Sequence, residues 1–468
     1  MSAGATYKTE AFLSFELAEW ATNLKYEDLS AEAIAAAKRF WFDSLGCAMG
    51  GSQQKDFKIA LDHCKQMGGA ETCDVFVDGF KTNPSDAAFL NSLMIRAMDY
   101  NDIYWKQDPS HPSDIICGPL AIVQMLGGSG KDVILGTIIA YEMEMRLCES
   151  GFPGVREYGW HHATLTGFAA PIACGAVLGL TKDELVQAIG ISASRTGSFG
   201  AVTAGKLTNM KNTVDPMATR AGVESALLAK RGYSGPEHMF DGKEGLSHVF
   251  GHEWKFEIMT DKLPKSPSDH YRILDCGMKS FPIEALSHAP LTAMMKIVQE
   301  HSINADDVTE IKVEVVARAA DILGDPHKYR PTSKETADHS LPYSLAVGLV
   351  DGMVTPLQFK QERIDDQGLI PVMDMVKVVP NEEFEKLFPE FQPSQVTITL
   401  KDGSSHVQRV DVPKGDPRDP MTEKEIAVKF HALGEGIIPK AQRETIREIA
   451  MDLENQATLD TFFAAMRA

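Results

Sequence analysis

The organisation of this chain turns on residues 97–114, which read Ala-Met-Asp-Tyr-Asn-Asp-Ile-Tyr-Trp-Lys-Gln-Asp-Pro-Ser-His-Pro-Ser-Asp. Residues 82–98 and 117–126 on either side have the apolar spacing of buried helices, so the stretch is predicted to be a loop between them. The first helix is expected to deliver Asp99 and Asp102 at its C-terminal end. Composition alone slightly favours a simple turn, because Asp, Ser and Pro are ordinary turn residues. Acids gathered around one histidine, on a loop held by rigid elements, favour proton-transfer chemistry.

Helical patterns dominate the chain up to about residue 260. Ser30 has the pattern of an N-cap, and Thr181-Lys-Asp-Glu184 that of a capping box. Residues 132–149 and 216–232 have helical spacing, the latter after a Gly/Ser/Thr-rich loop that leads to Lys211. A run of alanine and glycine precedes the capping box. Since small residues let helices pack closely, this run is predicted at the centre of a helical bundle.

Strand patterns appear later in the chain. Apolar and polar residues alternate over 311–315 and 396–400, as in half-buried strands. Asp402-Gly403 supplies the turn of a hairpin after the second of them, and a capping box at Thr422 restarts helices. We therefore predict a mainly α fold with a large helical domain, a smaller α+β lid domain and C-terminal helices that return to the helical domain. The predicted bounds are residues 1–268, 269–418 and 419–468.

Composition excludes several classes of function. The chain has 468 residues, of which 44% are hydrophobic and 24% charged, as in ordinary soluble proteins. Its net charge of −19 argues against nucleic acid or an anionic membrane as partner. No stretch approaches the ~20 apolar residues of a membrane span, and the first twenty residues lack the basic start and apolar core of a signal peptide. We expect a cytoplasmic protein.

The cysteines and one glycine-rich segment carry no site of their own. The seven cysteines form no C-x-x-C pair, which is a poor match to a zinc or iron–sulfur site, and they are expected to be reduced and mostly buried. Gly127-Gly-Ser-Gly-Lys131 lacks the glycine spacing, the Ser/Thr and the preceding strand of a phosphate loop. It is predicted to be a turn between helices.

Reactive side chains gather in a few other places, within apolar or glycine-rich surroundings. These places are His161-His162, Lys211, the segment Lys279-Ser-Phe-Pro-Ile-Glu284 with His288 after it, and His339 with Tyr343. Each has an ordinary alternative, such as a structural histidine or a surface lysine. Metal binding by the two adjacent histidines is not expected, because neighbouring residues on a helix do not face the same point.

In this order, these residues resemble the MmgE/PrpD family, and the resemblance covers nearly the whole chain. The matching segments are residues 42–47, 96–102, 111–114, 159–161, Lys211 with 218–222, 279–282 and 337–343. The family includes 2-methylcitrate dehydratase, cis-aconitate decarboxylase and an iminodisuccinate epimerase. The resemblance implies a site between a helical domain and an α+β lid, no metal, no cofactor, and a homodimer.

Two segments of the sequence can be compared with particular branches of that family. Asp-Tyr-Asn-Asp followed by His-Pro-Ser-Asp is most similar to the 2-methylcitrate dehydratase branch, and decarboxylase members tend to have histidine where this chain has Glu284. The segment after Gly159-Trp160 departs from the family pattern and is one residue shorter. Either His161 or His162 can therefore hold the family's histidine position.

The resemblance implies a dehydratase that converts a citrate-like tricarboxylate, 2-methylcitrate, to 2-methyl-cis-aconitate. Lys211 and Lys279 would neutralise substrate carboxylates, Asp99 or Asp102 would act as base or orient a histidine, and His111 would act as acid. The alternatives are decarboxylation of cis-aconitate, epimerisation of an amino-dicarboxylate and a non-enzymatic helical scaffold. The expected catalytic residues are Asp99, Asp102, His111, His161 and Lys211; the expected substrate-binding residues are His162, Lys279, Glu284, His288, His339 and Tyr343; Asp108 and Asp114 are expected to make turns and caps.

Overall fold

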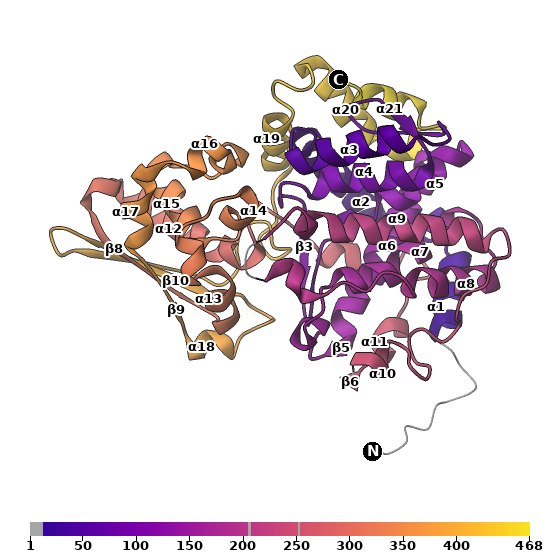
Figure 1. Cartoon of the computed structure of the whole chain (residues 1–468), viewed down its shortest axis with the longest axis horizontal. Coiled ribbons are helices and arrows are strands. Elements are labelled where there is room, and N and C mark those ends of the chain that lie inside the picture. Colours follow the sequence, from indigo (N-terminus) through magenta and orange to yellow (C-terminus); the bar gives the residue numbers. More distant parts are fainter. Residues whose placement is uncertain (1–12, 205–206, 251–252) are drawn as a thin grey trace.

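The computed structural model describes residues 13–204, 207–250 and 253–468. It is mainly α with small sheets, as predicted. Figure 1 shows a large helical part, coloured indigo to magenta, beside a smaller orange part built around a sheet, with the yellow C-terminal helices lying on the helical part. The first twenty residues, from which we expected no signal peptide, lie largely outside the described residues.

The helical part consists of helices before residue 261 and after residue 422. The helices are α1 (Leu13–Asn23), α2 (Ala31–Gly51), α3 (Lys55–Met67), α4 (Pro84–Arg96), α5 (Cys117–Leu126), α6 (Gly130–Ser150), α7 (Ala163–Val177), α8 (Lys182–Ala193), α9 (Met210–Ala229), α10 (Leu246–Phe250), α11 (Glu257–Thr260), α19 (Glu423–Leu433), α20 (Lys440–Met451) and α21 (Asp460–Met466). The side chains of Ser30, Thr181 and Thr422 accept hydrogen bonds from the backbone at the starts of α2, α8 and α19, which confirms the three predicted helix starts.

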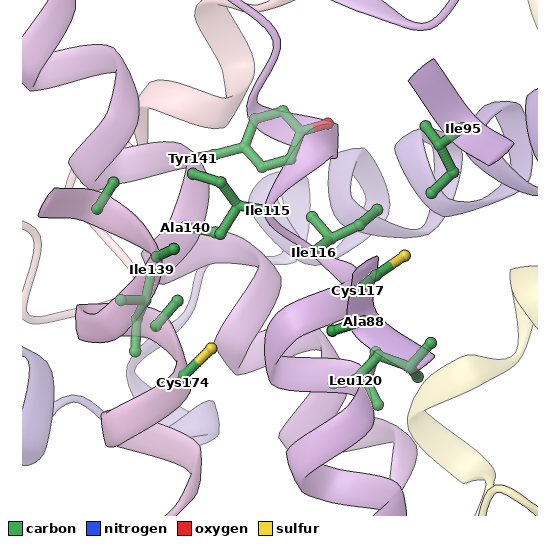
Figure 2. Close-up of a cluster of buried hydrophobic side chains, with 14 of the residues drawn as sticks. Ala88, Ile95, Ile115, Ile116, Cys117, Leu120, Ile139, Ala140, Tyr141 and Cys174 are labelled. Atoms are coloured by element: carbon green, nitrogen blue, oxygen red, sulfur yellow. The ribbon is translucent and has the colours of Figure 1, made fainter. Parts of the chain in front are cut away.

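Helix α7 lies at the centre of the bundle, as its small residues predicted. It contacts α1, α5, α6, α8 and α9. A Cβ built on Gly222 of α9 would lie 2.6 Å from the Cβ of Ala170 in α7, so only glycine allows the two backbones to come so close. Figure 2 shows the apolar packing of Ile115 and Ile116, which directly follow residues 97–114: they lie among side chains of α4, α6 and α7 such as Ile95, Tyr141 and Cys174.

The orange part contains a four-stranded sheet in the order β11-β10-β8-β9. Strands β8 (Val308–Val315), β10 (Ser394–Leu400) and β11 (Ser405–Val410) are antiparallel neighbours at the predicted positions, and Gly403 has a left-handed φ of 85° in the turn between the last two. Strand β9 (Val376–Pro380) pairs in parallel with β8 and was not predicted. The helices of this part are α12 (His288–His301), α13 (Ala317–Leu323), α14 (Lys334–Ala337), α15 (Leu341–Asp351), α16 (Gln361–Ile364), α17 (Ile370–Asp374) and α18 (Glu382–Glu385).

Residues 97–114 are not a simple loop, which corrects the sequence prediction. Helix α4 ends at Arg96, and β3 (Asp102–Trp105) lies between β4 (Pro109–Ser110) and β7 (Gly277–Met278). The segment is too short and too polar to show strand alternation, and β7 is distant in sequence. Four other two-residue strands also interrupt the region that was predicted to be almost entirely helical: β1 (Cys73–Asp74), β2 (Lys81–Thr82), β5 (Gly151–Phe152) and β6 (Glu253–Trp254).

Buried apolar residues form two clusters. One joins residues between Leu13 and Met278 with residues from Ile426 to Met466, and the other joins residues 283–410 with Trp105. The C-terminal helices therefore pack into the core of the N-terminal helices, through contacts of α19 and α20 with α2. The domain boundaries at residues 268 and 418 stay a prediction.

All seven cysteines are unpaired and buried, as expected. The described helices include none whose length and hydropathy together suit a passage across a bilayer.

Replacing Phe430 by Ala tests the return of the C-terminal helices. The Phe430 ring is 1% exposed and lies 4.3 Å from the Phe42 ring of α2, centre to centre. We expect Phe430→Ala to lower the free energy of unfolding by about 3–5 kcal/mol, because it leaves a cavity between α19 and α2. Val428→Ala, at an exposed position of the same helix, is the control and should change it by less than about 0.5 kcal/mol. Equal urea midpoints for the two variants would contradict the packing.

Candidate active site

A small cavity of about 40 Å³ lies where residues 97–114 meet α9 and the segment after β7. Most of the predicted site residues line it, namely Asp99, His111, His161, His162, Lys211, Lys279, Glu284 and His339. These residues are spread along the chain from the end of α4 to just before α15. The site is therefore assembled by tertiary packing.

Asp99 is the centre of the charge network. Its carboxylate lies 2.9 Å from Nζ of Lys279 and 3.3 Å from Nζ of Lys211, and it also pairs with Arg96. Burial alone raises the pKa of Asp99, but Lys211, Lys279 and Arg96 outweigh it and hold that pKa well below its usual value. The residue has a left-handed φ of 52°, which Asp tolerates better than most residues. A carboxylate held this firmly as an anion positions the lysines and is a poor proton acceptor.

Lys211 lies in the first turn of α9, buried beside two carboxylates. That helix begins at Met210 and not near Pro216, where the predicted helical spacing began. The Lys211 ammonium lies 3.7 Å from Asp338 in addition to Asp99, yet it makes no hydrogen bond of good geometry to the described residues. Burial lowers the pKa of Lys211 to about 8 despite the two carboxylates. An ammonium in this state is available to an anionic ligand.

His111 is held as a neutral imidazole. Its Nδ1 lies 2.6 Å from the backbone carbonyl oxygen of Asp102, and because a carbonyl can only accept, Nδ1 carries the proton. Burial, with Arg96 and Lys279 nearby, holds the pKa of His111 well below its usual value. The unprotonated Nε2 suits a base better than the acid role expected from the sequence.

His161 and His162 both line the cavity, with ring centres 4.0 Å apart. The backbone N–H of Ala163 donates to Nδ1 of His161 at 3.1 Å, so the proton of that neutral ring is on Nε2. Nε2 of His162 lies 3.5 Å from a carboxylate oxygen of Asp215. Both histidines precede the first residue of α7, and their donor atoms and one of Asp215 lie within 4.8 Å of one another. The helical geometry assumed in the sequence analysis therefore does not apply to these two histidines, and the expectation that they bind no metal stays a prediction.

Glu284 and His339 complete the wall on the side of the sheet-containing part. One carboxylate oxygen of Glu284 accepts the Leu286 N–H at 2.7 Å, and burial raises the pKa of Glu284 to about 7. Nδ1 of His339 lies 2.6 Å from Asp338, whose other partners are Lys334 at 3.1 Å and Lys211. Burial lowers the pKa of His339 to about 4, so its ring is neutral.

Three predicted site residues lie outside this cavity. The Asp102 carboxylate accepts the Ser113 N–H at 2.9 Å and the Ser113 hydroxyl at 2.6 Å, so Asp102 orients His111 through its backbone and its side chain makes a turn. The Tyr343 hydroxyl donates to the backbone carbonyl of Gln358, pointing away from the site. His288 lines a neighbouring cavity.

The two acids expected to make turns and caps have different roles. Asp108 does accept backbone N–H groups, from Val155 at 2.8 Å and Arg156 at 3.3 Å. Asp114 is buried and lies 3.4 Å from Nε of Arg96, so it forms an ion pair and is not a cap. The sequence analysis also missed Arg156, Asp338 and Asp215 as members or neighbours of the site; only Asp338, which directly precedes His339 in a matching segment, carried a signal.

A larger cavity of about 590 Å³ adjoins the small one. The two share Ile103, Trp105, Lys279 and Ala285 as a common wall. The cations of the larger cavity are already paired, for example Lys106 with Glu390 at 3.2 Å. Its volume is typical of a ligand pocket or an entrance, whereas the smaller one has room for only a few water molecules.

Comparison with known proteins identifies the family of the chain. Residues 15–259 match the MmgE/PrpD N-terminal domain, and residues 281–455 match the MmgE/PrpD C-terminal domain. The chain belongs to the MmgE/PrpD family. It is 26% identical over 459 residues to the cis-aconitate decarboxylase of Aspergillus terreus, covering 94% of this chain and 92% of that protein. It is 25% identical over 423 residues to the 2-methylcitrate dehydratase of Salmonella typhi, covering 81% of each, and 25% identical over 414 residues to the mitochondrial 2-methylcitrate dehydratase of Yarrowia lipolytica, covering 81% of this chain and 75% of that protein.

Chelation tests the prediction that this member of the family needs no metal. Two groups of buried ligand atoms lie close enough for a cation, one at Asp215 and the histidines and one at Asp99, Asp338 and His339. Lysines and Arg96 already neutralise the second group, so a metal ion would meet positive charge there. We expect dialysis against EDTA to leave activity on the tricarboxylate panel described below unchanged. A loss that is restored by a divalent cation would contradict the prediction.

Proposed function

We propose that this protein is a metal-independent lyase that dehydrates a citrate-like tricarboxylate, 2-methylcitrate being the first candidate. The observation that carries the proposal is the buried Lys211 ammonium, which faces the cavity beside Lys279 with no hydrogen bond of its own. A chain with a net charge of −19 has concentrated cations at one enclosed place. Several carboxylates on one small substrate would satisfy them, and the substrate would occupy the adjoining cavity of about 590 Å³ once the shared wall of the small cavity opens.

The reaction needs those cations. Removing a proton from carbon beside a carboxylate places more negative charge on that carboxylate, and preorganised cations in a dry site stabilise it. Lys211 and Lys279 supply this charge, with Arg156 on the cavity wall as a third cation. Because burial lowers the pKa of Lys211 to about 8, its contribution is present at neutral pH and is lost as the pH rises above about 8.

His111 is the proposed base. Its Nε2 has a free lone pair because Nδ1 donates to the Asp102 carbonyl, and it faces the cavity from the strand side. His339 presents an unprotonated Nε2 in the same way, with Nδ1 bonded to Asp338, and is the second candidate for this role. The depressed pKa of each ring keeps it neutral at pH 7.

Glu284 is the proposed acid for the leaving hydroxyl. Its pKa of about 7 means that a large fraction is protonated at neutral pH, and one of its oxygens is left free of hydrogen bonds to the described residues. A proton donor at this place allows the hydroxyl to leave as water, so dehydration is the first candidate. The relatives of both kinds match this chain at similar identity, so decarboxylation of cis-aconitate is the second candidate. Homodimer assembly and a cytoplasmic location stay predictions.

Product analysis tests the proposal. Purified protein would be incubated with 2-methylcitrate, citrate, cis-aconitate and an amino-dicarboxylate, followed by NMR and by carbon dioxide release. We expect an unsaturated tricarboxylate from 2-methylcitrate and no carbon dioxide from cis-aconitate. Carbon dioxide release without dehydration would establish the decarboxylase, epimerised amino-dicarboxylate the epimerase, and no turnover or binding the non-enzymatic scaffold.

Lys211→Met supplies the matched variant for this assay. We expect turnover to fall about a hundredfold or more, because the variant removes one preorganised charge at the reacting carboxylate. Lys58→Met, at an exposed position of α3, is the control and should keep full activity. Wild-type turnover in Lys211→Met would overturn the assignment of this cavity.

A further inference from the structure

A network of buried polar side chains lies behind His162, outside the cavity lining. It consists of Ser110 on β4, Glu144 on α6, Thr166 on α7 and Asp215 on α9, each at most 2% exposed. The proposed reaction uses none of them. Glu144 makes no ion pair with a described cation, which is unusual for a carboxyl group buried in the centre of a bundle.

The polar atoms of this network lie between 2.8 and 3.5 Å from one another. The Ser110 hydroxyl lies 2.8 Å and the Thr166 hydroxyl 2.9 Å from the same carboxyl oxygen, Oε1, of Glu144. The Thr166 hydroxyl also lies 3.0 Å from Oδ1 of Asp215. Oδ2 of Asp215 faces Nε2 of His162 at 3.5 Å. The network thus connects Ser110, which directly precedes His111 in the sequence, with His162.

The oxygen atoms of this network need one more hydrogen than its two hydroxyl groups supply. Three oxygen–oxygen contacts each require one hydrogen, but the hydroxyls of Ser110 and Thr166 supply only two. Without a third, one pair of oxygens would face each other with lone pairs alone, inside the protein core, which is costly. The third hydrogen must therefore be on one of the two carboxyl groups, Glu144 or Asp215.

The surroundings assign it to Glu144. Burial alone raises the pKa of Asp215, but His162, His161 and Arg96 outweigh it and hold that pKa well below its usual value. The acids that act most strongly on Glu144 are Asp215 on α9 and Asp102 on β3, and both raise its pKa; Cys148 on its own helix is a further titratable neighbour. Burial with these acids nearby raises the pKa of Glu144 to about 8.

We propose that Glu144 is protonated at neutral pH and is a positioning residue for His162. The Glu144 carboxyl donates to the Thr166 hydroxyl, which then donates to Oδ1 of Asp215; Oδ2 of Asp215 makes no hydrogen bond to the described residues and faces Nε2 of His162 at 3.5 Å. The Thr166 hydroxyl thereby holds the Asp215 carboxylate in place, and that carboxylate, 3.5 Å from Nε2, orients the His162 ring. When Glu144 ionises, the Thr166 hydroxyl donates to Glu144 and no longer donates to Asp215. The effect on turnover rests on the function proposed above; the protonation state of Glu144 does not.

Infrared difference spectroscopy tests the protonation directly. Wild-type protein minus Glu144→Gln at pH 7 should show the carbonyl stretch of a protonated carboxylic acid, and the band should disappear on raising the pH with a midpoint near 8. Glutamine keeps the size of the side chain and a donor for Thr166, so the variant is expected to fold. A difference spectrum at pH 7 that shows only an ionised carboxylate would overturn the proposal, whatever the substrate of the enzyme.

Kinetics of two Thr166 variants test the coupling to His162. Thr166→Ser keeps the hydroxyl and should retain kcat, whereas Thr166→Val should lower kcat by about tenfold to a hundredfold with a smaller change in KM, because His162 loses its fixed orientation. Equal kcat values for the two variants, with both folded, would overturn the positioning role. If no substrate is turned over at all, the proposed function fails while the infrared result still decides the state of Glu144.

Discussion

The carboxylate of Asp99 is the point on which the site depends. It pairs with Arg96 from α4, Lys211 from α9 and Lys279 from the segment after β7, so three remote parts of the chain meet at one buried anion. Burying these charges is costly, and the cost is met only while all partners are present, since removal of one leaves an uncompensated charge. The same contacts that hold the helical and sheet-containing parts together therefore prepare the cations for a substrate.

Lys429 is a second buried cation that contacts the same region. Lys429 of α19 lies 2.7 Å from the Asp43 carboxylate of α2 and donates to the backbone carbonyls of Tyr100 at 2.6 Å and Lys279 at 3.0 Å. The C-terminal helices thus fix the backbone at Tyr100, directly after Asp99, and at Lys279, which pairs with Asp99. Their return to the N-terminal bundle gives the site its rigidity as well as completing the core.

Sequence reasoning succeeded where the signal was local. The capping boxes at Thr181 and Thr422, the small residues of α7 and the alternation in β8 and β10 each depend on neighbouring residues, and the structure has each of them. It failed where the geometry depends on distant partners: the pairing of β3 with β7, the parallel partner β9, and the turn of Asp102 towards Ser113. The order of matching segments brought Asp99, His111, Lys211 and Lys279 together correctly, whereas Arg156 and Glu144 had no local pattern. Tyr343 was placed by its position in a matching segment, and its hydroxyl instead satisfies a backbone carbonyl in the second core.

A crystal structure of the protein with bound citrate would show directly whether Lys211 and Lys279 bind substrate carboxylates. Citrate carries the three carboxylates and the hydroxyl that the proposed substrate requires. We expect carboxylate oxygens within hydrogen-bond distance of Nζ of both Lys211 and Lys279, with Asp99 still between the two lysines and the hydroxyl facing Glu284. Citrate held elsewhere, with both lysines contacting only Asp99 and Asp338, would contradict it.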